Sequence, residues 1–143
     1  MKKKGYTLIE ILVVVVIIAT LAALTWPNYV AIKEKTLNRE AKASLALIRA
    51  AEKIYRLEQG YYYPYPPDGT STSNVSDINS FLKLSLPEST NVSWAITVDS
   101  TPSFEYSQAT RTGMGADGRQ WTIDFVGDNT EPVCAGGSGS NCL

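Results

Sequence analysis

The stretch that decides the fold is KKKGYTLIEILVVVVIIATLAALTWP, residues 2–27. Three lysines open it, and between Tyr6 and Trp26 the only charged residue is Glu10. A helix that runs from Tyr6 to Trp26 spans about 30 Å, which is the thickness of the hydrocarbon core of a bilayer. The sequence therefore predicts a membrane-spanning helix, with the lysines on the cytoplasmic side and the rest of the chain on the outer side.

Glu10 separates three interpretations of this helix. A secretory signal peptide would end in a small-residue cleavage site, and residues 19–23 offer only a weak one before Pro27. A passive anchor accounts for the length and the lysines but not for a carboxylate, which is costly in an apolar helix unless it is protonated or paired. A helix that takes part in assembly gives Glu10 a partner, and we favour this third interpretation.

The leader and the start of the helix together resemble a known family. Lys2-Lys3-Lys4-Gly5 followed by Tyr6-Thr7-Leu8-Ile9-Glu10 is similar to the leader of type IV pilins and of the pseudopilins of type II secretion. Members of that family usually have phenylalanine directly after the glycine, and here Tyr6 keeps an aromatic ring. Pro27 stands where helices of this family commonly carry a kink-forming proline.

The resemblance implies a processing site and an assembly contact. A membrane peptidase would cut between Gly5 and Tyr6, which makes residues 1–5 a leader peptide, and would methylate the new amine of Tyr6. In a bundle of helices, the carboxylate of Glu10 would then reach the cationic amine of an adjacent subunit. Breaking such a pair leaves an uncompensated buried charge, so the pair would select the register of assembly. Pro27 is the second assembly residue that the resemblance implies.

The composition argues against several classes of function. The 143-residue chain has no histidine, which removes the commonest general base and metal ligand. No nucleophile–base pair or phosphate-binding loop is visible, so we expect neither an enzyme nor a cofactor. Residues 28–59 carry seven Lys or Arg against four Glu, whereas residues 60–143 carry three against nine Asp or Glu. The acidic second part gives no support for binding a nucleic acid, which depends on basic side chains.

Residues 28–59 predict an amphipathic helix that follows the membrane segment, residues 6–27. Charged residues, among them Arg49 and Glu52, are expected on its outer faces, and Gly60 is a suitable stop. Because proline has no N–H to donate, Pro27 predicts a bend or a local opening between the two segments. The apolar residues of the expected stripe recur with spacings of three, four or seven, at Val30, Leu37, Ala41, Leu45, Ile48, Ala51 and Tyr55.

Residues 60–143 predict a small globular head. A loop rich in tyrosine and proline opens it at residues 61–69, and a short capped helix is expected at residues 76–83. Alternating patterns at residues 92–99, 104–107 and 121–125 predict an antiparallel sheet of three or four strands. The apolar stripe of the long helix would cover one face of this sheet. The expected fold is therefore α+β, as the resemblance to type IV pilins also implies.

Three smaller features of the head concern candidate sites. The GxGxxG pattern at residues 113–118 precedes a strand rather than a helix, so it predicts a hairpin turn and no dinucleotide site. Cys134 and Cys142 lie in a segment delivered outside the cytoplasm, where pairing is expected, and they resemble the C-terminal disulfide loop of type IV pilins. Asp117, Asp124 and Asp128 are a weak alternative calcium site of the kind that major pseudopilins often have. They are scattered over a turn, a strand and a loop, so we predict no metal site.

These features favour a structural subunit. The leading hypothesis is a pilin that polymerises through its N-terminal helix into a type IV pilus on the cell surface. The first alternative is the major pseudopilin of a type II secretion system, which would form a periplasmic pseudopilus. The second alternative is a monomeric membrane-anchored binding protein.

The resemblance also implies partners and a location. The expected partners are other copies of the chain, a prepilin peptidase and the inner-membrane assembly machinery. Before assembly the chain would lie in the lipid of the inner membrane, with its N-terminus in the cytoplasm and its head in the periplasm. After assembly it would be part of an extracellular filament.

Overall fold

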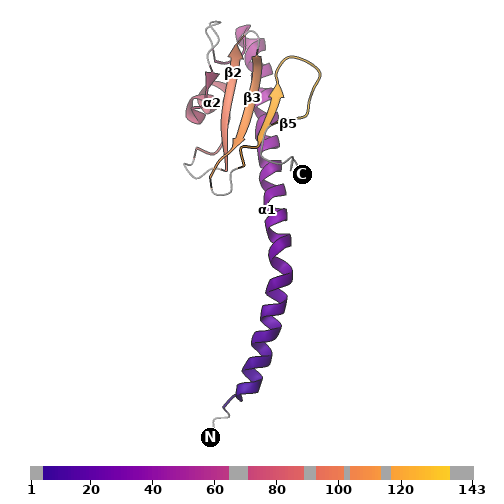
Figure 1. Ribbon diagram of the computed structural model, residues 1–143. Coiled ribbons are helices and arrows are strands. Elements are labelled where there is room, and N and C mark those ends of the chain that lie inside the picture. The colour runs from indigo at the N-terminus through magenta and orange to yellow at the C-terminus, as the bar shows by residue number, and fades with distance from the viewer. Residues whose placement is uncertain (1–4, 65–70, 89–92, 102–103, 114–116, 136–143) are drawn as a thin grey trace. The chain divides into compact units, whose positions relative to one another are not determined.

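The computed structural model describes residues 5–64, 71–88, 93–101, 104–113 and 117–135. The chain divides into two compact units, Met1–Thr36 and Leu37–Leu143, and each is described by itself. Within the described residues the elements are, in chain order (Figure 1), α1 (Leu8–Gln59), β1 (Ser71–Thr72), α2 (Val75–Leu82), β2 (Trp94–Thr101), β3 (Phe104–Arg111), β4 (Gln120–Asp124) and β5 (Val133–Ala135).

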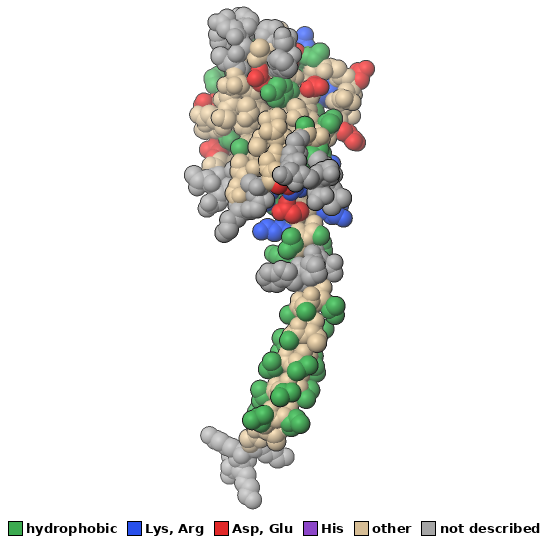
Figure 2. All heavy atoms as spheres, viewed as in Figure 1, with side chains coloured by type: hydrophobic (Ala, Val, Ile, Leu, Met, Phe, Trp, Pro, Cys, Tyr) green, Lys and Arg blue, Asp and Glu red, His purple; other side chains and the backbone are tan. Residues whose placement is uncertain are grey.

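The first unit contains the N-terminal part of α1. Among the described residues, α1 is the one helix that is long and apolar enough to cross a membrane, and no part of its apolar window is buried. Hydrophobic side chains line this part of the helix in Figure 2. A helix that is apolar on all sides and uncovered by its own chain requires an apolar environment. The predicted membrane-spanning helix is consistent with this arrangement.

Helix α1 continues through Pro27. It is a single element from Leu8 to Gln59, so the local opening predicted at this proline is absent from the described helix. Proline removes one backbone donor from the helical ladder, and the helix is nevertheless continuous across it. The helix therefore persists across a residue that the sequence marked as an interruption.

The second unit contains an antiparallel sheet whose strands neighbour one another in chain order, β1-β2-β3-β4-β5. The pairing of β2 with β3 runs from Trp94 opposite Arg111 to Thr101 opposite Phe104. The predicted α+β fold is confirmed, but within the described residues the sheet has five strands instead of three or four. β1 and β5 have two and three residues, which is too short to show the alternation from which strands are predicted.

The part of α1 in the second unit covers one face of the sheet. Ala41 and Leu45 pack into a cluster with both buried tryptophans, Trp94 and Trp121. Ile48 packs into a second cluster with residues of α2, of β2 and of the tyrosine loop. The predicted stripe is confirmed for these three helix residues. Leu37, Ala51 and Tyr55 are partly buried against the same clusters, whereas Val30 is exposed.

Two charged residues that we expected on the outer faces of α1 are buried instead. The guanidinium of Arg49 donates to the carbonyl oxygens of Asp124 and Gly127, at 2.9 and 2.8 Å. The carboxyl group of Glu52 is fully buried, and its Oε2 accepts a hydrogen bond from the N–H of Tyr63 at 2.9 Å. The prediction was wrong because both side chains bind backbone groups of the end of β4 or of loops, which helical periodicity does not reveal.

The start and end of α2 agree with the predicted capped helix. Asn74 is its N-cap, and its Oδ1 accepts a hydrogen bond from the N–H of Ser76 at 3.1 Å. Lys83 ends the helix in the left-handed conformation with φ 54°. In the predicted hairpin turn between β3 and β4, Gly113 and Gly118 have positive φ values, which glycine adopts without strain.

Candidate processing and assembly site

The predicted processing site lies just before α1. Gly5 and Tyr6 are exposed and outside regular secondary structure, and the helix begins at Leu8. A Cβ atom added to Gly5 would meet nothing within 4 Å. The fold of the described chain therefore does not require glycine at position 5.

Thr7 and Glu10 form a capping box at the start of α1. The Oε2 atom of Glu10 accepts hydrogen bonds from the N–H of Thr7 at 3.3 Å and from its hydroxyl at 3.4 Å. In return, the N–H of Glu10 donates to Oγ1 of Thr7 at 3.3 Å. This reciprocal arrangement satisfies donors at a helix N-terminus that have no partner within the helix.

The capping box changes the interpretation of Glu10. From the sequence, this carboxylate is expected to need a partner in another subunit. In the structure the chain itself supplies donors from Thr7, and a negative charge in the first turn is also favoured by the helix dipole. The Thr-x-x-Glu spacing that signals a capping box is present in the sequence, so the arrangement could have been recognised there.

Cleavage between Gly5 and Tyr6 would place a new cationic amine beside this box. The amine would belong to Tyr6, the residue before Thr7, at the same end of the helix as Glu10. The box uses Oε2 of Glu10. A chemically complementary pair, one amine and one carboxylate, would thus lie at the N-terminus of each processed helix.

The other predicted site residues do not join this group. Pro27 lies within α1, and its side chain is outside the described residues. Cys134 is the middle residue of β5, opposite Trp121 of β4, and it is not a free cysteine. Cys142 is outside the described residues, so the pairing of Cys134 with Cys142 stays a prediction.

The three aspartates of the weak calcium alternative lie in different surroundings. Asp117 forms an ion pair with Arg119 at 3.0 Å. Burial alone would raise the pKa of Asp117, but the hydrogen bonds and charge of Arg119 hold that pKa below its ordinary value. Asp124 ends β4, and Asp128 lies in the exposed turn after it. The described part of the chain contains no group of three or more histidine, cysteine or acidic residues that could hold a metal ion.

Two basic residues of the acidic head are occupied within it. Arg119 is buried and donates to Oδ1 of Asn38 at 3.0 Å, in addition to its pair with Asp117. Arg111 is also buried and donates to the carbonyl oxygens of Ser93 and Thr112, each at 2.9 Å. These guanidinium groups are therefore not available to bind phosphate.

A comparison with protein families bears on the N-terminal geometry. Residues 1–26 match the family described as the prokaryotic N-terminal methylation motif. The chain carries this methylation motif. It covers Gly5, Tyr6 and the capping box, so the predicted processing site and the observed start of α1 belong to one recognised segment.

Curated proteins similar to this chain come from type II secretion systems and from a type IV pilus. The chain is 39% identical over 61 residues to the type II secretion system core protein G of Escherichia coli (strain K12), which is 43% of this chain and 42% of that protein. It is 36% identical over 61 residues to the type IV major pilin protein PilA of Myxococcus xanthus (strain DK1622), which is 43% of this chain and 28% of that protein. The protein of Vibrio cholerae serotype O1 named type II secretion system core protein G is also 36% identical over 61 residues.

The matches cover less than half of each of these relatives. The chain spans about two fifths of the length of the secretion-system relatives and less of the pilin. No solved structure matches the chain. The resemblance of the N-terminal part of the chain to type IV pilins and type II secretion pseudopilins is confirmed, and this part contains a helix long and apolar enough to cross a membrane.

Proposed function

We propose that this chain is a structural subunit, and not an enzyme, that polymerises through its N-terminal helix into a type IV pilus on the cell surface. The observation that supports the proposal is the start of α1, where the match to the methylation motif over residues 1–26 coincides with a helix that is apolar on all sides. Proposed partners are further copies of the chain, a prepilin peptidase and the inner-membrane assembly machinery. The subunit would be held in the inner membrane before assembly and in an extracellular filament afterwards.

The exposed surface of α1 supports a helix that packs against other helices. In the membrane, lipid would cover its Val, Ile and Leu side chains, and in a filament neighbouring helices would cover them. Small residues allow helices to approach closely in an apolar environment. Such residues occur within the apolar segment at Ala19, Thr20, Ala22 and Ala23.

The pair of Glu10 and the Tyr6 amine would supply the register of the polymer. In an apolar bundle, each charge is stabilised only where the other lies opposite it. A subunit that enters one turn too high or too low leaves both charges without a partner. The pair therefore favours a single axial position, whereas the apolar side chains alone would allow several.

Two substitutions of Glu10 separate this role from helix capping. Glu10→Gln keeps an acceptor for the capping box, because glutamine also serves at that position, but removes the charge. Glu10→Leu removes both. We expect both variants to insert into the membrane and to give far fewer filaments than the wild-type chain, in cells that contain no other copy.

Electron microscopy of sheared surface material and mass spectrometry of its N-terminus are the measurements. Filaments built mainly from chains that begin at methylated Tyr6 would agree with the proposal. A normal filament yield from Glu10→Gln would show that Glu10 serves only as a cap. If the wild-type chain forms no filaments and stays in the membrane as a monomer, the alternative of an anchored binding protein would replace the proposal.

A second candidate is the major pseudopilin of a type II secretion system. The names of the secretion-system relatives favour this candidate, whose filament would stay in the periplasm. The candidates differ in the expected effect of calcium. For a pilin that lacks a calcium site, we expect the melting temperature of the head to be the same with calcium and with a chelator. A marked rise with calcium that Asp124→Asn abolishes would favour the pseudopilin.

A further inference from the structure

Helix α1 carries a second apolar stripe in its C-terminal part. The residues of this stripe, which we call the outer seam, are all exposed: Ala43, Leu47, Ala50, Ile54 and Leu57. At 3.6 residues per turn, the outer seam lies on the other side of the helix from Ala41, Leu45 and Ile48, which pack on the sheet. Leu47, Ile54 and Leu57 are 48%, 58% and 87% exposed. The core of the head therefore does not account for these residues.

The spacing of the outer seam is that of a helix that packs on another helix. Its members follow one another at intervals of four, three, four and three residues, which is the alternation of a and d positions in a coiled coil. Leu47 and Ile54 then occupy a positions, and the alanines and Leu57 occupy d positions. A stripe that meets only a sheet does not need this strict alternation.

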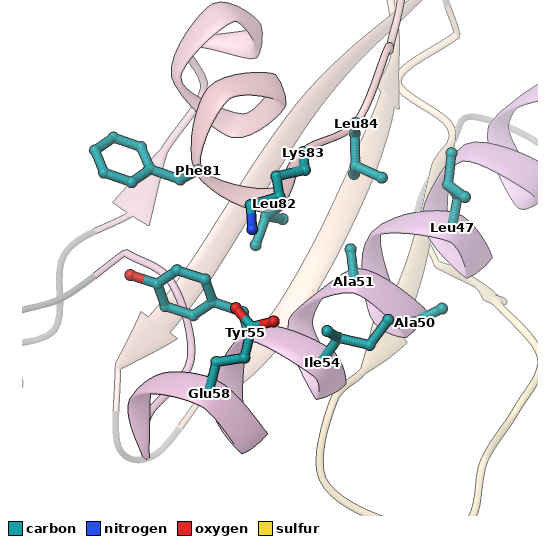
Figure 3. Close-up of a pocket in the computed structure, with 10 residues that line it drawn as sticks. All are labelled: Leu47, Ala50, Ala51, Ile54, Tyr55, Glu58, Phe81, Leu82, Lys83 and Leu84. Carbon is teal, nitrogen blue, oxygen red and sulfur yellow. The ribbon is translucent and has the colours of Figure 1, made fainter.

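A groove beside the outer seam leaves it open to a partner. Leu47, Ala50 and Ile54 line one wall, the end of α2 and the residues after it line the other, and the volume is about 280 Å³. Figure 3 shows these three side chains facing the groove, opposite Phe81 and Leu84. The described part of the head thus approaches the seam without covering it.

Charged residues beside the seam indicate what the partner is. Lys53 occupies the g position before Ile54, and Glu58 occupies the e position after Leu57. Both are exposed, and within the described residues neither forms an ion pair. In a parallel pair of identical helices, a residue at g lies opposite the residue five positions later in the partner. Lys53 of each copy would therefore face Glu58 of the other.

We propose that the outer seam packs against the outer seam of a second copy of this chain, as a parallel and in-register helix pair that forms outside the membrane segment while both copies are still anchored in the membrane, before filament assembly. The inference rests on membrane insertion, which is part of the proposed function. Two copies that enter one membrane with the same topology are necessarily parallel. Confinement to the same membrane also raises their effective concentration, so a short seam with two alanines at d suffices.

Cysteine cross-linking of the full-length chain tests the pair. The chain is produced in the membrane of a host without a pilus assembly system, and dimers are measured after mild oxidation on a non-reducing gel. Ala50→Cys occupies a d position, where in-register packing brings the two copies within the range of a disulfide. Gln59→Cys is the matched control, because it is exposed on the same helix but occupies an f position that faces away from a partner. We expect several-fold more dimer from Ala50→Cys than from Gln59→Cys.

Charge reversal tests the register of the pair. In the Ala50→Cys chain, Lys53→Glu should reduce the dimer several-fold because it places like charges opposite each other, and Lys53→Glu combined with Glu58→Lys should restore it. Glu131→Lys, an exposed charge reversal in the turn before β5, should change nothing. A dimer yield from Ala50→Cys no higher than from Gln59→Cys overturns the proposal, and failure of the double reversal to restore the dimer overturns the parallel register. If cross-linking succeeds but the wild-type chain builds no filament in its own cells, the proposed function fails and the helix pair stands.

Discussion

Glu52 is a carboxyl group enclosed by the head. Burial raises its pKa from 4.5 to about 8, although the hydrogen bond from the N–H of Tyr63 partly opposes this rise. Its second oxygen, Oε1, has no hydrogen-bond partner among the described residues. At neutral pH the folded head therefore favours the protonated form of Glu52, whereas the unfolded chain favours the ionised form.

This pKa predicts how stability depends on pH. Between about pH 4.5 and 8 the folded state binds more protons than the unfolded state, so the free energy of unfolding falls as pH rises. The contribution of Glu52 is fully present below pH 4.5 and is lost as pH rises through 8, and it is on the order of 5 kcal/mol at most. We expect the melting temperature of the full-length chain in detergent to fall between pH 5 and 9, and Glu52→Gln to be more stable than wild type at pH 9.

The matched control is Glu58→Gln, which removes an exposed carboxylate six residues later on the same helix. It should keep the wild-type pH dependence. If Glu52→Gln and the wild-type chain show the same dependence between pH 5 and 9, Glu52 is ionised in the folded head and its predicted role is wrong.

The burial of two charged residues of α1 could not be predicted from the sequence. Arg49 and Glu52 follow the polar pattern of an outer helix face, yet both are buried. Their partners are the carbonyl oxygens of Asp124 and Gly127 and the N–H of Tyr63. These backbone groups come from the end of β4 and from loops, which tertiary packing brings beside α1, so no local pattern identifies them.

At the scale of elements, the apolar pattern predicted most of what the structure contains. The buried stripe of α1 and the longer strands were predictable because burial on one face imposes a fixed period on the sequence. β1 and β5 were not, because strands of two or three residues owe their existence to pairing with a neighbour. The capping box was predictable from the spacing of Thr7 and Glu10, but the apolar run around Glu10 favoured a contact with another subunit in the membrane.

The capping box predicts the behaviour of the first turn of α1. Thr7→Ala removes the hydroxyl that accepts from the N–H of Glu10, which should cost about 1 kcal/mol of local stability. We expect the amide hydrogens of Glu10 and Ile11 to exchange several-fold faster in the variant, measured by NMR in detergent micelles.

Thr20→Ala is the control for this experiment. The Thr20 hydroxyl donates to the carbonyl oxygen of Ile17 within the helix, at 2.8 Å, and caps nothing. Its loss should leave exchange in the first turn unchanged. Equal exchange rates in Thr7→Ala and wild type would mean that the turn is held by the helix alone.

At the scale of the whole molecule, the second unit has its own core. Both hydrophobic clusters lie within Leu37–Leu143, and the apolar surface that needs a membrane lies in the first unit. We therefore expect a chain that lacks residues 1–27 to be soluble and folded. Its buried Trp94 and Trp121 should give blue-shifted fluorescence that moves to the red in a cooperative transition with urea.

A variant of the truncated chain tests whether this signal reports the core. Leu45 is fully buried in the cluster that contains both tryptophans. Leu45→Asp should abolish the cooperative transition because it buries an unpaired charge. A truncated wild-type chain with red-shifted fluorescence and no transition would show that the head depends on residues 1–27 to fold.

The two outermost strands of the sheet, β1 and β5, are also its shortest. Another chain adds to a sheet through the free N–H and C=O groups along an edge strand. Edge strands of two and three residues offer few such groups, so neighbouring heads in the proposed filament would gain little by adding to β1 or β5. If the chain is displayed in many adjacent copies, as proposed, these short edges would protect it from amyloid-like growth and would leave contacts between its heads to side chains.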